Sequence, residues 1–315
     1  MKLARVAPAI TTALALGAGG PGTPGASAQD YQPTRVSKAV ELLAQDQPIY
    51  YTQVDGGGYE EGRRLAQTWA DYITYNMEHS PFDMSALRGF MQGLVDGGPT
   101  KSGHRTPTVI AVLPFGGVDE TVMRANYWMV EQVLGSGVHG VLLAHARSPE
   151  AVRVLVQAAR YPYAPAAEGI DEGLRGSGGQ GFAARIWGVS QQEYRRRADP
   201  WPLNPDGELL IGLKIEDRHA LANAEASTAV PGVGFAEWGP GDMAMSFDAS
   251  GNAQVLVDAR RRVLEATKSA GIAFLNTMSA RDFQAMIDEG VRIGANPGAE
   301  VADLGRRYTG RTMPW

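Results

Sequence analysis

The sequence of residues 211–242, IGLKIEDRHALANAEASTAVPGVGFAEWGPGD, decides the fold class of this chain. An apolar run ends at Glu216, a segment with Ala-rich helical spacing follows, and a second apolar run leads into the turn at 239–242. This pattern indicates a β-α-β unit with an acidic residue, Glu216 or Asp242, after each strand. Loops at the carboxyl ends of parallel strands converge at one edge of a sheet. The pattern therefore predicts a ligand or metal site at that edge.

Apolar runs and amphipathic segments alternate along most of the chain. The predicted strands are 49–54, 71–77, 108–113, 140–144, 209–215, 233–238, 271–275 and 290–294. The predicted helices, with apolar residues at three- and four-residue spacing, include 84–95, 120–134, 149–159, 218–226, 253–270 and 280–288. Eight alternations predict a TIM (β/α)8 barrel, which typically has ~250 residues. An open doubly wound sheet is the alternative.

One long segment, residues 161–204, interrupts this alternation between the fourth and fifth strands. It is expected to be irregular. Long segments of this kind in compact domains are usually functional or contact a partner subunit.

The composition indicates a globular protein and argues against several function classes. The 315 residues are 44% hydrophobic and 20% charged, with a net charge of −5. A nucleic-acid-binding protein would carry a basic footprint, whereas the arginine runs at 195–197 and 260–262 lie among acidic residues and are expected to form solvated helix faces. With no cysteine, the chain has no disulfide, zinc–thiolate or thiol chemistry.

Residues 1–28 have the pattern of a cleaved secretory signal peptide. Lys2 and Arg5 precede a short apolar stretch, and residues 26–28 form an A-x-A cleavage site. The apolar stretch is too short to span a bilayer. We therefore expect export to the periplasm or the exterior without a membrane anchor, and a single barrel domain over residues 29–315. A disordered leader rich in Ala and Gly is the alternative.

Three groups with catalytic or metal-binding chemistry follow predicted strands. Glu216 follows the fifth strand, Asp242 the sixth, and the pair Glu78 and His79 the second. Two carboxylates leave several positions of an octahedral cation open for substrate and water, as is common for Mg²⁺ and Mn²⁺. His79 is suited to proton transfer near neutral pH. Capping or hydrogen-bonded loop residues are the structural alternative.

Four segments, in order, resemble the HpcH/HpaI aldolase/citrate lyase family of metal-dependent 2-oxo acid aldolases, and the resemblance extends from about residue 42 to 304. They are YNMEHSPFD at 75–83, ARYP at 159–162 with LRG at 174–176, KIE at 214–216, and GPGDM at 239–243. One such motif would be weak evidence. Four in the same order are strong evidence.

This resemblance implies a mechanism for the matching positions. Glu216 and Asp242 would hold Mg²⁺, Mn²⁺ or Co²⁺, which would stabilise the enolate of a 2-oxo acid by Lewis-acid catalysis. His79, through a water, would move the proton on the aldol hydroxyl. Backbone amides in the turn formed by Gly239, Pro240 and Gly241 would bind the substrate carboxylate. The resemblance also implies a homo-oligomer, either a hexamer or a trimer.

Several positions depart from the family pattern. Leu113 stands where pyruvate aldolases of the family carry an arginine, Gly135 replaces an aspartate, and Lys214 replaces a glutamine. Loss of a preorganised charge costs ~10²–10³ in rate, so an unmodified pyruvate aldolase is not expected. Lys214 either relocates the positive charge or indicates a different substrate. His145, where the family usually has an apolar residue, is expected to be an added ligand or a second base, or else a loop histidine bonded to a backbone carbonyl. Arg175 is expected to shape the Arg-Gly turn or to bind substrate.

The sequence thus predicts an exported, metal-dependent lyase that breaks or forms a C–C bond next to a carbonyl, acting on a small carbonyl compound or 2-oxo acid. The predicted substrate-binding residues are Lys214, Gly239, Pro240, Gly241, His145 and Arg175. One alternative is a metal-dependent carboxylate- or carbonyl-binding protein that has lost turnover, and another is a lyase of this fold with a non-pyruvate substrate. Cleavage of a CoA ester is disfavoured, because CoA is absent outside the cytoplasm and no basic pocket for it is evident.

Overall fold

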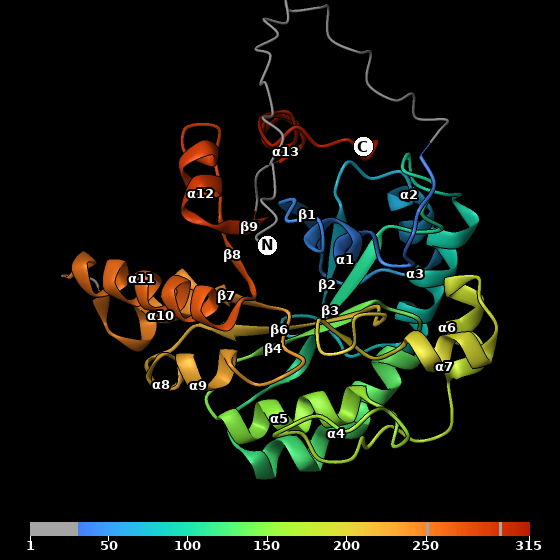
Figure 1. Cartoon of the computed structure of the whole chain (residues 1–315), viewed down its shortest axis with the longest axis horizontal. Coiled ribbons are helices and arrows are strands. Elements are labelled where there is room, and N and C mark those ends of the chain that lie inside the picture. Colours follow the sequence, from blue (N-terminus) through green and yellow to red (C-terminus); the bar gives the residue numbers. More distant parts are fainter. Residues whose placement is uncertain (1–30, 250–251, 296–297) are drawn as a thin grey trace, which may run out of the picture.

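Parallel strands close into a barrel at the centre of the molecule (Figure 1). The computed structural model describes residues 31–249, 252–295 and 298–315, so the predicted signal peptide at 1–28 lies outside the described residues. The strands follow one another in the order β4-β3-β2-β1-β9-β8-β7-β6, and pairing of β4 with β6 closes the ring. The predicted TIM barrel is therefore confirmed, and the open doubly wound sheet is wrong.

The strands lie close to their predicted positions, and all pairings are parallel. The short β5 pairs with the start of β6 in addition to the eight strands of the ring. The strand bounds are β1 Ile49–Val54, β2 Tyr72–Asn76, β3 Thr108–Gly116, β4 Gly140–Ala144, β5 Pro200–Trp201, β6 Leu209–Ile215, β7 Phe235–Trp238, β8 Ala273–Thr277 and β9 Val291–Ala295.

Helices surround this barrel (Figure 1), and polar caps fix where several of them begin. Asp83, Asp119 and Ser148 each accept hydrogen bonds from backbone amides in the first turn of the helix that follows, which satisfies donors that a helix leaves unpaired. The helix bounds are α1 Lys38–Leu43, α2 Tyr59–Leu65, α3 Met84–Asp96, α4 Glu120–Gly135, α5 Pro149–Ala159, α6 Gln180–Trp187, α7 Gln191–Arg197, α8 Arg218–Ala222, α9 Ala224–Thr228, α10 Pro240–Ser246, α11 Ala253–Ala270, α12 Phe283–Glu289 and α13 Gly298–Tyr308.

Two expectations about these connections are wrong. The predicted helix 218–226 is divided into α8 and α9 at Asn223, whose backbone is not helical. Segment 161–204 is not irregular throughout, because it contains α6, α7 and β5. Helices α6 and α7 span only two turns each, and such short helices give too few apolar repeats to be recognised by periodicity.

Side chains of the strands alternate between the inside of the barrel and an outer core beneath the helices. Ile110, Val112 and Leu142 pack in the interior, whereas Ala111 and Leu113 belong to the outer core. Because successive residues of a strand point to opposite sides, this alternation also decides which polar residues of β6 and β7 can reach the interior.

A buried ionic cluster lies where the strands begin. Asp71, just before β2, lies 3.0 Å from Lys38 of α1, 3.2 Å from Arg306 of α13 and 2.8 Å from Arg311. Burial alone would raise the pKa of Asp71, but the three cations hold it well below its ordinary value. The cluster ties the first and last described helices to the barrel.

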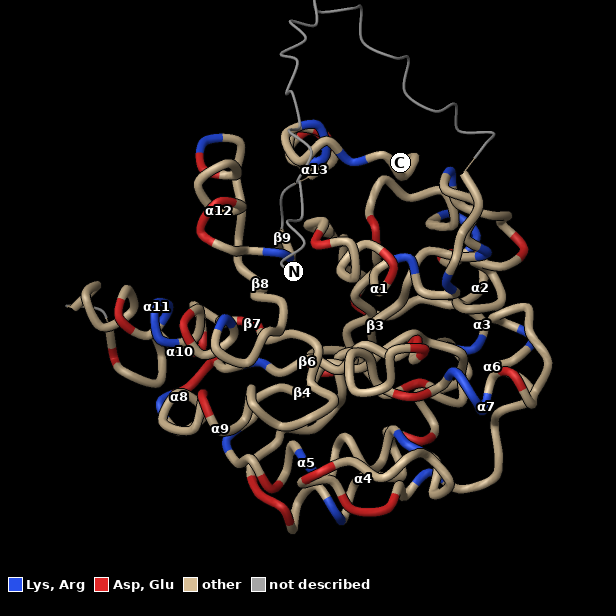
Figure 2. The backbone as a smooth tube through the Cα atoms, viewed as in Figure 1, with Lys and Arg blue, Asp and Glu red and all other residues tan. Residues whose placement is uncertain are grey.

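Charged residues of both signs are interspersed along the outer helices (Figure 2). The two arginine runs lie on α7 and α11 as predicted, and they pair with acids such as Glu193, Glu208 and Glu225. Within the described ranges, no helix combines the length and the apolar character that a membrane crossing requires.

Candidate active site

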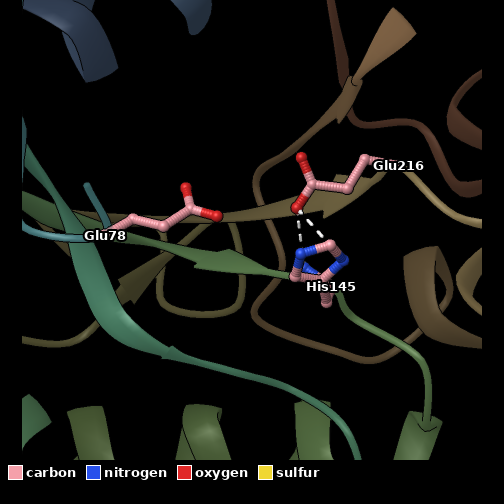
Figure 3. Close-up of side chains that lie close together, drawn as sticks. All are labelled: Glu78, His145 and Glu216. Atoms are coloured by element: carbon pink, nitrogen blue, oxygen red, sulfur yellow. Dashed lines mark hydrogen bonds and ion pairs between the residues drawn. The ribbon is translucent and has the colours of Figure 1, made fainter. Parts of the chain in front are cut away.

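Charged side chains from three strand ends converge at the mouth of the barrel. Glu78 follows β2 and Glu216 follows β6, and their carboxylates point toward one another (Figure 3). The Lys214 ammonium lies between them, with Nζ 2.6 Å from Glu78 Oε2 and 3.8 Å from Glu216 Oε2. One ligand atom from each of Glu78, His145 and Glu216 lies within 4.8 Å of the others. This part of the mouth is therefore compact enough for these groups to share a cation.

The electrostatics of this cluster favour added positive charge. Glu216 is only 2% exposed. Burial raises its pKa, and the nearby Glu78 charge acts in the same direction, although Lys214 and the His145 amide oppose them. Burial would lower the pKa of Lys214, but the charges of Glu237, Glu216 and Glu78 outweigh it and raise that pKa. A divalent cation would relieve the repulsion between the carboxylates.

His145 links Glu216 to a second acid, Asp217. Its backbone has a φ of 45°, which is uncommon for a residue other than glycine. In this conformation the His145 amide donates to Glu216 Oε1 at 2.9 Å, and Nδ1 lies 2.9 Å from Asp217 Oδ2. The ring is thus bonded to a carboxylate rather than to a backbone carbonyl, and it lies beside Glu216 (Figure 3).

Asp217 is a member of the site that the sequence did not single out. Its Oδ1 accepts from the first amides of α8, while Oδ2 meets the His145 ring and, at 2.8 Å, the Nε–H of Arg147. Burial alone would raise the pKa of Asp217, but these bonds lower it to about 2. Asp217 is therefore ionised at neutral pH and holds His145 in place. Its position in the sequence, directly after Glu216 and before a predicted helix, could have identified Asp217 as a site residue.

His79 lies at the rim of the same cluster. Its side chain is 68% exposed, and Nε2 is 3.6 Å from Glu78 Oε2. The loop is fixed by Asn76, whose Oδ1 accepts from the backbone amides of Glu78 and His79. The structure therefore places the predicted base beside Glu78, at the rim of the cluster and in contact with solvent.

The turn after β7 approaches Glu216 closely. A Cβ atom added to Gly239 would lie 2.5 Å from Glu216 Cβ and 2.9 Å from Oε2, so glycine is required there. A Cβ at Gly241 would meet open space. Pro240 has no N–H to offer a substrate. Asp242 lies in the first turn of α10, and it is not a member of the Glu78–His145–Glu216 group.

A cavity of about 70 Å³ lies inside the barrel, next to this cluster. Its polar lining includes Gln53, Asn76, His79, Lys214 and Glu237. Burial, reinforced by the neighbouring acids, raises the pKa of Glu237 to about 7. Within the apolar run 233–238 of the sequence, Glu237 was assigned no role. Strand alternation, which places it inside the barrel, was the missed signal.

Leu113 does not face the site. It is fully buried in the outer core, because the preceding Val112 takes the inward position and the β3–β4 register shifts beyond that residue. The side chain at the position matched to the family arginine thus points into the outer core and not toward the mouth. Lys214 and His145, by contrast, do lie at the mouth.

Arg175 also lies away from the mouth. Its Nη2 donates to the Tyr194 hydroxyl at 2.6 Å, and its guanidinium stacks over the Tyr161 ring at 4.8 Å. Tyr194 in turn donates to the carbonyl of Leu134, in the last turn of α4. A helix that starts after a strand at the mouth ends near the opposite side of the barrel. The structure therefore does not bring Arg175 to the substrate site, and its contacts support the alternative that it shapes its loop.

A parallel barrel with carboxylates, a lysine and histidines where its strands end has the arrangement of TIM-barrel enzymes. Residues 63–299 match the sequence profile of the HpcH/HpaI aldolase/citrate lyase family, and the chain belongs to this family.

Relatives of the chain carry aldolase names. The hydroxypyruvate/pyruvate aldolase of Deinococcus radiodurans is 28% identical over 232 residues, which cover 72% of each chain. The 2-keto-3-deoxy-L-rhamnonate aldolase of Klebsiella pneumoniae is 26% identical, covering 71% of this chain and 82% of that protein. Among solved structures, an HpcH/HpaI aldolase/citrate lyase family protein from Burkholderia cenocepacia has a TM-score of 0.65 and 21% identity, and the alignment covers 86% of this chain and 96% of that one.

Proposed function

We propose that this protein is a divalent-metal-dependent aldolase that breaks or forms a C–C bond in a small hydroxy-2-oxo acid. The observation that carries the proposal is the convergence of Glu78, His145 and Glu216 within 4.8 Å at the barrel mouth. Family membership supports the reaction class. The names of the relatives point to 2-oxo acids, since pyruvate, hydroxypyruvate and the keto-deoxy sugar acid share that group.

The donor set fits a divalent cation. Glu216 would be the principal ligand, and Glu78 or His145 could add a second donor from the same group. Asp242, in the first turn of α10, is the further ligand that we propose from the sequence. Carboxylate oxygens suit Mg²⁺, whereas an imidazole nitrogen would favour Mn²⁺ or Co²⁺. When bound, the ion would polarise the 2-oxo group as a Lewis acid.

The protein's own side chains would move the proton and stabilise charge. His79, exposed at the rim, would take the proton of the substrate hydroxyl through a water. As the C–C bond breaks, its electron pair would move to the 2-oxo acid fragment. The Lys214 ammonium, held by Glu78 at 2.6 Å, would stabilise the negative charge that develops.

The rest of the proposed substrate contacts come from the loops after β4 and β7. The amide of Gly241, in the first turn of α10, has no partner within that helix, so it could bind the substrate carboxylate. Gly239 would contribute mainly by its small size, which admits Glu216. His145, held by Asp217, would contact the substrate or the ion.

A retro-aldol assay tests this proposal. Purified protein with Mn²⁺ or Mg²⁺ should release pyruvate or hydroxypyruvate from hydroxy-2-oxo acids, and EDTA or Glu216→Gln should abolish release. Glu225→Gln, which removes a charge paired with Arg262 on the outer surface, should leave the rate unchanged. Metal-dependent ligand binding without turnover would instead support a binding protein and would refute the proposed reaction.

We also propose that the protein is exported after cleavage near residue 28 and that it assembles into a hexamer or trimer. Export is supported by the basic, apolar and A-x-A pattern of residues 1–28. N-terminal sequencing of the protein purified from its native host and light scattering in solution test these two proposals separately.

A further inference from the structure

Glu237 is a carboxyl group inside the barrel with no hydrogen bond or ion pair among the residues that the structure describes. Buried polar groups are normally partnered, and the partly exposed Glu237 carboxyl faces the cavity rather than a protein partner. Glu237 lines the cavity of about 70 Å³, which is large enough for a small group or a water. This geometry points to a partner that enters the cavity from outside the protein.

The sheet register places Glu237 next to the proposed reaction site. Glu237 on β7 is opposite Lys214 on β6, and Glu216 is the next residue of the same β6 face. Lys214 bridges upward to Glu78 and Glu216. Glu237 therefore lies one layer deeper than the proposed metal ligands, and His79 lines the same cavity from the rim.

The proposed reaction needs two proton carriers. In cleavage, His79 takes the hydroxyl proton and the C–C bond breaks. The electron pair of that bond stays on the 2-oxo acid fragment, which becomes an enolate. That enolate must then gain a proton at C3 before it can leave as the 2-oxo acid. His79 is at the solvent-exposed rim of the cavity and Glu237 lies deeper in it, so the two groups are placed to act on different atoms of one substrate.

We propose that Glu237 is the catalytic acid that protonates C3 of the enolate and, in the synthetic direction, the base that removes a C3 proton from the 2-oxo acid. In cleavage the O–H bond of the Glu237 carboxyl breaks and a C–H bond forms at C3, while the enolate electrons restore the 2-oxo group. The Glu237 carboxylate is then reprotonated from solvent, while His79 releases the hydroxyl proton to solvent, so the protons balance. This inference rests on the proposed aldolase function.

The charge environment of Glu237 supports this role. In the metal-free protein, burial raises the pKa of Glu237 to about 7, within the range that suits a general acid or base. Lys214 opposes this rise. The groups that reinforce it are Glu216, Glu78 and Asp242. Across the cavity, burial raises the pKa of Tyr51, which stays protonated.

Exchange of the methyl protons of pyruvate in D₂O, followed by proton NMR with Mg²⁺, tests the inference without any aldol. The native protein should exchange these protons, and Glu237→Gln should slow the exchange by ~10²-fold or more, the usual contribution of an acid–base group. Glu237→Asp should retain part of the rate. Glu225→Gln should match the native protein. Mn²⁺ affinity, measured by electron paramagnetic resonance, should be the same for all four proteins.

The outcomes separate this inference from the proposed function. If the native protein cleaves aldols but Glu237→Gln exchanges C3 protons at the native rate, Glu237 is not the acid. Loss of Mn²⁺ affinity in Glu237→Gln would assign the residue to metal binding and would also overturn the inference. If the native protein neither cleaves nor exchanges, the aldolase proposal itself fails.

Discussion

Replacing Gly239 by alanine tests whether the position of Glu216 controls the site. The new Cβ would lie 2.5 Å from Glu216 Cβ and 2.9 Å from its Oε2. Carbon atoms in contact are normally about 3.5–4.0 Å apart. Either Glu216 or the turn must therefore shift by roughly 1 Å to restore contact distance. Because Glu216 is buried beneath this turn, the carboxylate cannot simply rotate into solvent.

The expected effects follow from this displacement. Misplacing a catalytic group by about 1 Å can cost ~10²-fold in rate, and overpacking a tight position costs about 1–3 kcal/mol of stability. We expect Gly239→Ala to lower both kcat/KM for aldol cleavage and Mn²⁺ affinity, by about 10–100-fold, the range seen when groups supporting metal ligands are lost.

Gly241→Ala is the matched control, because its Cβ would enter open space two residues further along the same turn. Both variants remove one glycine from the same segment, so a general stiffening of the turn would affect them alike. Titration with Mn²⁺ and steady-state assays on the two proteins separate the effects. Equal Mn²⁺ affinity in Gly239→Ala and Gly241→Ala would show that close approach to Glu216 does not matter.

Three further predictions concern stability, pH and positioning. Asp71→Ala leaves three buried cations without their carboxylate and should lower the free energy of unfolding by about 3–5 kcal/mol in urea titrations, against no change for Glu225→Gln. The pKa of Glu237 is raised to about 7 in the folded state. The contribution of this carboxyl to the free energy of unfolding is therefore fully present below its unfolded pKa and is lost as pH rises through 7. The metal-free protein should therefore lose ~2–3 kcal/mol relative to Glu237→Gln between pH 4.5 and 8, and parallel stability curves for the two would contradict this. Asp217→Asn keeps a capping side chain for α8 but weakens the hold on His145, and should reduce kcat by roughly tenfold or more; an unchanged kcat would remove Asp217 from the site.

Much of the fold was predictable from the sequence, because strand and helix periodicities are local properties. The apolar run before Glu216 and the capping pattern of helices such as α3 and α5 marked their elements within a few residues. Short helices were not predictable in the same way. Helices α6 and α7 have eight and seven residues, and α8 and α9 have five each, so apolar spacing repeats too few times in them to be recognised.

The candidate site was predicted less completely. Strand ends identified Glu216 and His79, which the structure does bring to one mouth. Glu237 was overlooked, because a single acid in an apolar run has no periodic signal of its own. Its importance follows from which way it faces, and that depends on register.

By itself, the sequence determined the alternation of strands and helices, and hence the barrel and the end at which acids gather, since these follow from side-chain periodicity along one segment. Only the tertiary structure decided which strand ends meet. Closure of β4 against β6 places His145 beside Glu216 and Asp217, and register turns Leu113 outward and Glu237 inward. Distances between residues on different strands depend on closure and on loop dihedrals, such as the positive φ of His145, and neither is encoded in a local pattern.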